Sequence, residues 1–164
     1  MRTLKWEDLD DLLEMINSLV AEKADIVRAE KVSRTAEIDW LSQALGRMEK
    51  GEILYLVAEV GGKVVANSEI GRRRDGYDRH VGGIGIAIME GYRDIGIGTQ
   101  MIKALIKQAR KMSLKVLTLS AFESNKRAIR VYQKVGFVQT GRIPRKFLRN
   151  GKYVDEVIMT LFLE

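Results

Sequence analysis

The residues of this chain best suited to chemistry form a glycine-bearing turn between two apolar segments. The turn follows the apolar run 84–89 and precedes the amphipathic run 100–112, so we expect it to connect a strand to a helix. Backbone N–H groups at the start of a helix attract anions, and glycine lets an anion approach the main chain closely. The turn therefore predicts a site for a phosphate-bearing ligand such as a nucleotide-like cofactor. Its residues are Arg93, Asp94, Ile95, Gly96, Ile97, Gly98 and Thr99.

A second pattern lies downstream in the segment 125–137, which reads Asn-Lys-Arg-Ala-Ile-Arg-Val-Tyr-Gln-Lys-Val-Gly-Phe. Helical spacing puts Asn125, Ile129 and Tyr132 on one stripe. Asn125 is a suitable N-cap, and Gly136 is a suitable helix stop. We therefore expect a helix over 125–134 that presents an amide and a phenol on the same face.

The other elements must bring these two patterns together. Helical periodicity marks 7–20, 35–48 and 98–112, with Thr35 as the expected N-cap of the second helix. Strand patterns mark 1–5, 53–60, 63–70, 80–88, 115–119, 138–141 and 153–163. The glycines at 82, 83 and 85 suggest a bulge or a close approach to the backbone. An antiparallel half followed by strand-helix-strand-helix predicts a mixed α+β fold.

Composition narrows the class of protein. The chain has 164 residues, of which 46% are apolar, and this suits a single domain over 1–164. It has no cysteine and one histidine, His80, so we expect neither a disulfide nor a metal site. No run approaches the ~20 apolar residues that a membrane span needs. The start of the chain lacks the pattern of a signal peptide, so we expect a cytoplasmic protein without membrane association.

The net charge of +6 admits two interpretations. A basic surface can attract nucleic acid or polyphosphate ligands, but it can equally be a solvated face. No nucleic-acid motif accompanies the charge, so we expect no nucleic acid partner. The basic groups at 72–74 and 142–149 could hold an acidic ligand, and solvent exposure is the simpler interpretation.

Together the two patterns resemble the GNAT superfamily of acetyl-CoA-dependent N-acetyltransferases. The family signature Gln/Arg-x-x-Gly-x-Gly/Ala is met by residues 93–98, and Asn-x-x-Ala-x-x-x-Tyr-x-x-x-Gly-Phe by residues 125–137. Glu90 stands where many relatives have proline. The resemblance implies a central, mostly antiparallel, splayed sheet of about six to seven strands flanked by about four helices.

The resemblance also implies how acetyl-CoA is bound. Amides of residues 93–99 would hold the diphosphate, and Arg93 could add a direct charge. The pantetheine arm would pair with the backbone of Ile86 and Ile88, where an amide could polarise the thioester carbonyl. Asn125 matches a position that contacts the cofactor arm, and Ala128 would be small to let the arm pass.

The resemblance gives Tyr132 the role of general acid toward the departing CoA thiolate. A core aromatic with a satisfied hydroxyl is the alternative interpretation of Tyr132. The general base remains open among Glu69, His80 and Glu90. Asp25 and Glu30, in the polar segment 22–34, could shape substrate recognition or form a solvated loop.

The activity expected from the resemblance is direct acetyl transfer from acetyl-CoA to a primary amine in a ternary complex. The acceptor remains open among a protein N-terminus, an amino acid and a small amine or polyamine, and a homodimer also remains open. An acyl-CoA-binding sensor without turnover is the first alternative. A nicotinamide or flavin protein is the second, although a mid-chain turn with Met101 at the third glycine position of G-x-G-x-x-G argues against it.

Overall fold

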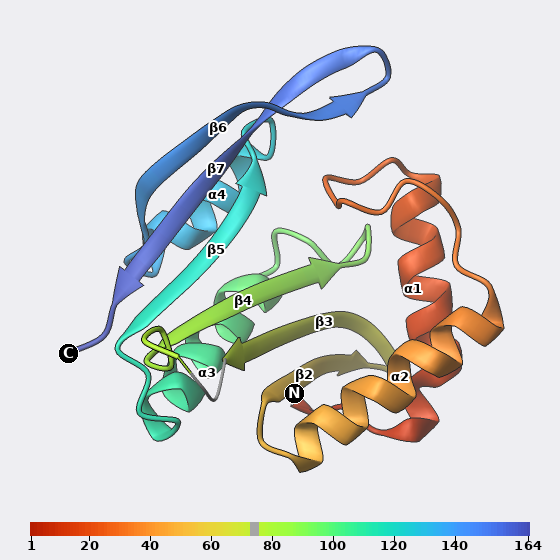
Figure 1. Ribbon diagram of the computed structural model, residues 1–164. Helices are drawn as coiled ribbons and strands as arrows, with labels where there is room; N and C mark the ends of the chain where they lie inside the picture. Colours follow the sequence, from red (N-terminus) through yellow and green to blue (C-terminus); the bar gives the residue numbers. More distant parts are fainter. Residues whose placement is uncertain (73–75) are drawn as a thin grey trace.

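A computed structural model describes residues 1–72 and 76–164 of the chain and contains one twisted sheet with helices on both faces (Figure 1). The expected α+β class is confirmed. In chain order the elements are β1 (Arg2–Thr3), the 3₁₀ helix η1 (Trp6–Asp8), α1 (Leu9–Ala21), α2 (Arg34–Glu49), β2 (Ile53–Val60), β3 (Lys63–Arg72), β4 (Val81–Ile88), α3 (Ile97–Lys111), β5 (Val116–Phe122), α4 (Lys126–Lys134), β6 (Val138–Arg149) and β7 (Lys152–Phe162).

The sheet has the strand order β1-β2-β3-β4-β5-β7-β6. All neighbours are antiparallel except β4 and β5, which are parallel. This parallel pairing runs from Val81 opposite Val116 to Gly83 opposite Thr118 and ends there. Beyond it the two strands diverge, and Figure 1 shows the resulting wedge between two halves of the sheet. The splayed sheet expected from the resemblance is therefore present.

Each diverging strand stays with its antiparallel neighbour. Strand β4 remains paired with β3 as far as Ile88 opposite Ala66, while β5 remains paired with β7 as far as Phe122 opposite Glu156. Antiparallel pairing satisfies one edge of each strand along its whole length. Among residues 1–72 and 76–164, no strand pairs with the other edge of β4 over residues 84–88.

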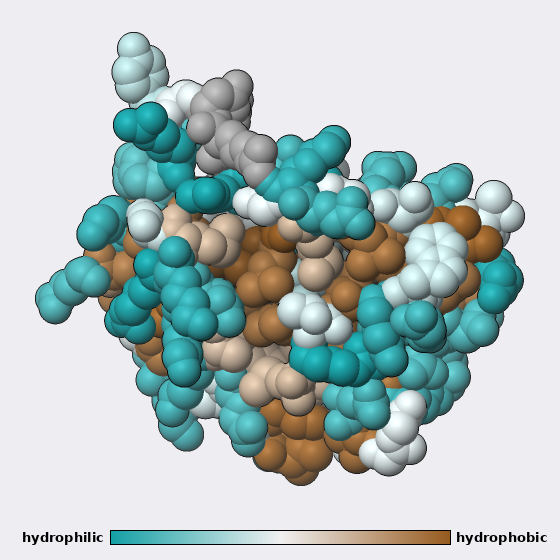
Figure 2. Space-filling view, turned by 90° about the horizontal axis from the view of Figure 1, so that it is seen from below, coloured by the Kyte–Doolittle hydropathy of each residue, from teal (hydrophilic) through white to brown (hydrophobic). Residues whose placement is uncertain are grey.

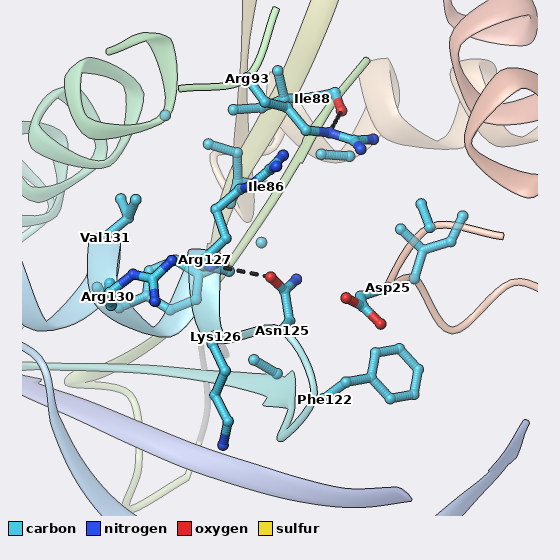
Figure 3. Close-up of a pocket in the computed structure, with 18 of the residues that line it drawn as sticks. Asp25, Ile86, Ile88, Arg93, Phe122, Asn125, Lys126, Arg127, Arg130 and Val131 are labelled. Atoms are coloured by element: carbon cyan, nitrogen blue, oxygen red, sulfur yellow. Dashed lines mark hydrogen bonds between the residues drawn. The ribbon is translucent and has the colours of Figure 1, made fainter. Parts of the chain in front are cut away.

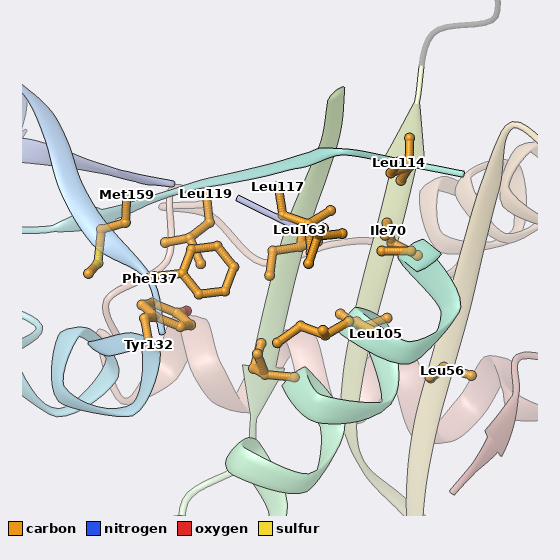
Figure 4. Close-up of a cluster of buried hydrophobic side chains, with 14 residues drawn as sticks. Leu56, Ile70, Leu105, Leu114, Leu117, Leu119, Tyr132, Phe137, Met159 and Leu163 are labelled. Atoms are coloured by element: carbon orange, nitrogen blue, oxygen red, sulfur yellow. The ribbon is translucent and has the colours of Figure 1, made fainter. Parts of the chain in front are cut away.

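Two apolar cores hold the helices against the sheet. Under α3 and α4, Ile102 and Leu105 pack with Leu117 and Phe137, in the cluster drawn in Figure 4. Under α1 and α2 a second cluster includes Leu12, Leu19, Leu41, Val57 and Val64. Helix periodicity in the sequence indicated most of these contacts, because a helix at the surface of a sheet buries one stripe.

Two local expectations are corrected by the structure, and a third is confirmed. The N-cap of α2 is Ser33, whose hydroxyl accepts from the Ala36 amide at 3.2 Å, and Thr35 lies inside the helix. Strand β6 runs to Arg149, well beyond the expected end at 141, since an edge strand tolerates Pro144 where the register shifts. The expected end of the preceding helix is confirmed, because Gly136 has a φ of 103° after α4.

The glycines of β4 cause no bulge, because the β3–β4 register is continuous. Gly82 and Gly85 instead allow neighbouring side chains to lie close to the backbone of β4. A Cβ at Gly82 would lie 2.7 Å from Leu114 Cδ1 and 3.0 Å from Leu117 Cδ2, and a Cβ at Gly85 would lie 3.3 Å from Glu69 Oε1. Gly82 therefore lets β5 and the segment between α3 and β5 pack tightly on β4 just before the wedge opens.

The lower end of the molecule, seen in Figure 2, has apolar side chains at its centre and hydrophilic ones around them. This distribution is ordinary for a protein surface, much of which is apolar. Across the described ranges, no helix is both long and apolar enough to span a membrane.

Replacement of Gly82 by alanine tests whether close packing holds the paired end of β4 and β5. We expect Gly82→Ala to lower the free energy of unfolding by about 1–3 kcal/mol, because buried Leu114 and Leu117 must move. Gly83→Ala is the matched control, since a Cβ there meets nothing within 4 Å. Urea unfolding measures both, and equal stability of the two variants would contradict this account.

Candidate functional site

A cavity of about 1100 Å³ occupies the wedge between the two halves of the sheet. Its walls come from the end of β4, the turn before α3, the end of β5, helix α4 and the segment that follows α1. Figure 3 shows side chains from all of these elements directed toward this space. Expected site residues that line the cavity are Ile86, Ile88, Arg93, Asp94, Gly96, Gly98, Thr99, Asn125, Ala128 and Tyr132.

The glycine turn presents main chain to the cavity. Gly96 is the N-cap of α3 with a φ of 92°, a left-handed conformation that favours glycine, and its position supplies no side-chain cap. A Cβ at Gly98 would lie 3.1 Å from Ile88 Cδ1, so α3 starts close to β4. Ile95 is 63% exposed and Ile97 packs with Met101, and neither lines the cavity. The turn can therefore offer amides to an anion without intervening side chains.

Arg93 is engaged within the protein. Its Nε donates to the Ile88 carbonyl at 2.8 Å, and its guanidinium forms ion pairs with Glu22 and Glu90. The side chain thus ties the turn to the end of β4. Because two carboxylates already neutralise it, Arg93 is poorly placed to supply the direct charge toward a diphosphate that the sequence suggested.

The free edge of β4 carries the amides that the resemblance assigned to the thioester and its arm. The Met89 amide donates to the Val65 carbonyl of β3 at 3.0 Å. Successive amides of a strand point to opposite edges, so those of Ile86 and Ile88 point away from β3 and toward the wedge. Both residues line the cavity. Their amides are therefore available to an extended ligand.

Helix α4 contributes polar groups from the other wall. Asn125 Oδ1 accepts from the Ala128 amide at 3.0 Å, so Asn125 is an N-cap and also lines the cavity. Arg127 reaches back to Asp94 of the turn, with 3.3 Å between Nη2 and Oδ2. Both interpretations of Asn125 in the sequence are thus compatible with its position.

Tyr132 is a core residue that also lines the cavity. Its side chain is 7% exposed and its ring lies 6.2 Å from that of Phe137, yet it lines the cavity. Burial raises the pKa of the Tyr132 phenol to about 12. The phenol is therefore a protonated hydrogen-bond donor throughout the physiological range.

Glu69 lies on the face of the sheet opposite α3, where it lines a second cavity of about 540 Å³. Its carboxylate lies over Gly85 and accepts a hydrogen bond from the Tyr55 hydroxyl. Burial, followed by the charge of Glu69, raises the pKa of Tyr55 above its ordinary value. Ile84 and Ser120 line both cavities, so Glu69 faces the closed end of the wedge from the side opposite α3.

The other base candidates differ in position. His80 is exposed beside the first residue of β4, and it lines neither cavity. Glu90 lines the first cavity, but it is paired with Arg93. Of the basic groups, Arg73 and Arg74 lie outside the described residues. The structure therefore brings Glu69 to the wedge and leaves His80 at the other end of β4.

Several cavity residues were not found by sequence reasoning. Phe122 and Phe147 line the wall near β6, and Glu22 lines the wall near β4. Asp25, which the sequence offered only as an alternative to a solvated loop, also lines the cavity, whereas Glu30 does not. No spacing signal in the sequence indicates these residues, because each reaches the site through a contact between distant segments.

Comparison with known proteins decides the family. Residues 12–137 match the Acetyltransferase (GNAT) family. The chain belongs to this family. It is an acetyl-CoA-dependent N-acetyltransferase, and the expected fold, acyl donor and enzyme class are thereby confirmed.

Similar proteins and solved structures cover between 65% and 99% of this chain. It is 24% identical over 159 residues to an L-methionine sulfoximine/L-methionine sulfone acetyltransferase of Pseudomonas paraeruginosa, covering 96% of this chain and 90% of that protein. It is 31% identical over 108 residues to an L-amino acid N-acetyltransferase of Escherichia coli, covering 65% of this chain and 67% of that protein. The fold matches a phosphinothricin acetyltransferase from Sinorhizobium meliloti in complex with AcCoA, with a TM-score of 0.87 and 18% identity over 99% of this chain and 86% of that chain.

Replacement of Gly96 by alanine tests the turn as the diphosphate site of this acetyltransferase. A side chain at a φ of 92° is strained, and relief of that strain would move the amides of the first α3 turn. We expect Gly96→Ala to weaken CoA binding about 5- to 30-fold, as ~1–2 kcal/mol of strain implies. Isothermal titration with CoA measures this, with Gly46→Ala in α2, where a Cβ meets nothing, as the control. Unchanged affinity in Gly96→Ala would contradict the assignment.

Proposed function

We propose that this enzyme acetylates the free amine of a small amino-acid-like acceptor by direct attack on acetyl-CoA in a ternary complex. The observation that carries this proposal is the wedge, which has a phenol on one wall and a carboxylate across the sheet from its closed end. Relatives named for acetylation of L-amino acids and of L-methionine sulfone support the acceptor class.

Backbone groups in the site are suited to three parts of acetyl-CoA: the diphosphate, the pantetheine arm and the thioester carbonyl. Amides at 96–99 would bind the diphosphate, since a helix start without a side-chain cap favours an anion. The free edge of β4 would pair with the pantetheine arm. An amide of Ile86 or Ile88 would donate to the thioester carbonyl and stabilise the charge that develops on its oxygen, which can contribute ~3 kcal/mol.

Glu69 is the proposed general base on the acceptor side. An amine must lose a proton before or during attack, and at pH 7 this costs ~4 kcal/mol for a group with a pKa near 10. A carboxylate beside the wedge can hold the ammonium and then accept its proton. Tyr55 donates a hydrogen bond to Glu69, whose side chain lies against the face of β4 at Gly85.

Tyr132 is the proposed donor to the sulfur of the leaving group. Full proton transfer from a phenol of pKa about 12 to a thiolate of pKa ~8.5 would be uphill by ~5 kcal/mol. The general-acid role therefore takes the form of hydrogen-bond donation while the C–S bond breaks. The C–N bond forms as the C–S bond breaks, and Glu69 accepts the proton that the nitrogen loses. CoA leaves as a thiolate that accepts a hydrogen bond from Tyr132 and then takes a proton from solvent.

Acetyl transfer itself is tested by thiol release with a panel of acceptors. The panel contains L-methionine sulfone, L-methionine, spermidine and a peptide with a free N-terminus. We expect thiol release with the amino acids. Tight CoA binding without release on any amine would contradict the proposal and favour the sensor alternative.

The Tyr132→Phe variant should lower kcat by about 10²–10³, which is the usual contribution of one preorganised hydrogen-bond donor. Because the phenol stays protonated below its pKa of about 12, the loss should be the same at every pH from 6 to 10. Tyr153→Phe, at an exposed position on β7, is the control. A full rate in Tyr132→Phe across this pH range would rule out the donor role.

The Glu69→Gln variant should lose activity mainly at low pH. The acceptor amine is protonated there and needs a base, whereas at high pH it loses its proton to water unaided. We expect a decrease of about 10²-fold in kcat/KM at pH 7, with recovery toward the wild-type value near pH 10. The control is Glu59→Gln, whose carboxylate pairs with Arg2 and lines neither cavity. An equal loss at all pH values would argue against the base role.

A further inference from the structure

The segment between α1 and α2 crosses the open end of the wedge (Figure 1). We call residues 22–27 the strap; they form no helix or strand, and all of them line the first cavity. At the start of the strap, Glu22 is paired with Arg93, whose Nε donates to the Ile88 carbonyl. The strap is thereby fixed to the half of the sheet that contains β4.

The other attachment is made by Arg149, at the end of β6. Its guanidinium donates to the carboxylate of Asp25, to the Lys23 carbonyl at 2.6 Å and to the Ala24 carbonyl at 3.1 Å. The same group lies 5.0 Å from the centre of the Phe122 ring. One side chain therefore fixes the strap to the half of the sheet that contains β5, β7 and β6.

Burial strengthens these attachments. The side chains of Arg149 and Asp25 are 26% and 29% exposed, and those of Arg93 and Glu22 are 22% and 24% exposed. Ion pairs at such partly buried positions are screened less than pairs on an open surface. Ser124 adds a hydrogen bond to Asp25 at 3.3 Å. The strap is therefore a bridge with a charged anchor on each side of the wedge.

The bridge restricts the room left for an acceptor. Acetyl-CoA would occupy the side of the first cavity lined by the turn and α4, which leaves the side lined by the strap, Phe122 and Phe147 for the acceptor. The first cavity meets the second cavity, which Glu69 lines, at Ile84 and Ser120. Figure 3 shows Asp25 facing Asn125 and Phe122 across this space. A free amino acid has no further residue attached and would lie wholly within this space. A peptide continues beyond its first residue and would need the strap and β6 to separate.

We propose that Arg149 determines acceptor size, because its hold on the strap admits small free amines and excludes the N-termini of peptides. This inference rests on the proposed acetyl transfer to a primary amine. It assigns to Arg149 a positioning role, since the residue acts through Asp25 and the strap backbone and not on the reacting atoms.

The test compares one acceptor in free and peptide form. Free L-methionine sulfone and a tetrapeptide with that residue at its N-terminus are assayed with the wild type, Arg149→Gln and Asp25→Asn. We expect the ratio of kcat/KM for the amino acid to that for the peptide to fall at least tenfold in both variants. Asp25→Asn leaves the contact between Arg149 and Phe122 intact, so the pair of variants separates the strap from local packing.

Arg142→Gln is the matched control. Arg142 also lies on β6 and is ion-paired, with Asp155 and Glu123, but it does not touch the strap. The ratio of kcat/KM for the amino acid to that for the peptide should be the same in Arg142→Gln as in the wild type. Hydrogen exchange at the amides of residues 22–27 gives a readout independent of activity, and it should become faster in Arg149→Gln and Asp25→Asn but not in Arg142→Gln.

The outcomes separate this inference from the proposed function. Equal use of amino acid and peptide by the wild type, or an unchanged ratio in both strap variants, would overturn the role of Arg149 while acetyl transfer stands. A wild type that acetylates no amine would overturn the proposed function and this inference with it. Slow, unchanged exchange of the strap in both variants would likewise contradict its attachment through Arg149.

Discussion

Pairing between β4 and β5 stops at Gly83 and Thr118, and the rest of the site depends on that interruption. A strand in a continuous sheet has both edges hydrogen-bonded, and it offers no backbone group to a ligand. Here β4 keeps its partner on one side and loses it on the other over residues 84–88. The protein thus has a row of backbone groups that an extended ligand can satisfy as a further strand would.

The wedge stays open because each half of the sheet is stabilised separately. Strand β4 is held by β3, and β5 is held by β7, each through antiparallel pairing along its length. Helices α1 and α2 cover one half, while α3 packs under the paired end. Closing the wedge would require the two halves to rotate against well-packed cores, which deform reluctantly. The cavity is therefore part of the folded architecture.

Charged side chains connect the two halves where the backbone does not. Arg93 links the glycine turn, the end of β4 and the strap, and Arg149 links the strap to β6. Arg127 adds a link from α4 to Asp94 of the turn. Guanidinium groups suit this task because one planar fork can contact several acceptors at once. Part of the excess positive charge thus serves to hold the walls of the site.

Local sequence patterns determined the elements and the family, because strands, helices and turns are encoded by periodicity and by glycine over a few residues. The turn at 93–99 and the stripe through Asn125 and Tyr132 were identified in this way. The same reasoning ended β6 too early at Gly141, ahead of Pro144, since only the tertiary structure makes this strand an edge that tolerates proline. It also predicted Thr35 as the cap of α2, whereas the cap is Ser33, two residues earlier, because residue type alone does not fix where the helix begins.

Only the tertiary structure decided what each charged residue does. Arg93 forms an ion pair with Glu22 of the strap. Glu69 lies beside the wedge, whereas His80 lies at the other end of β4. Arg149 and Asp25 are 124 positions apart in the chain, and no periodic pattern relates them. Their contact exists because two halves of a splayed sheet leave a gap that one loop must cross. Spacing in a sequence determines which residues share an element, whereas the path of the whole chain determines which elements meet.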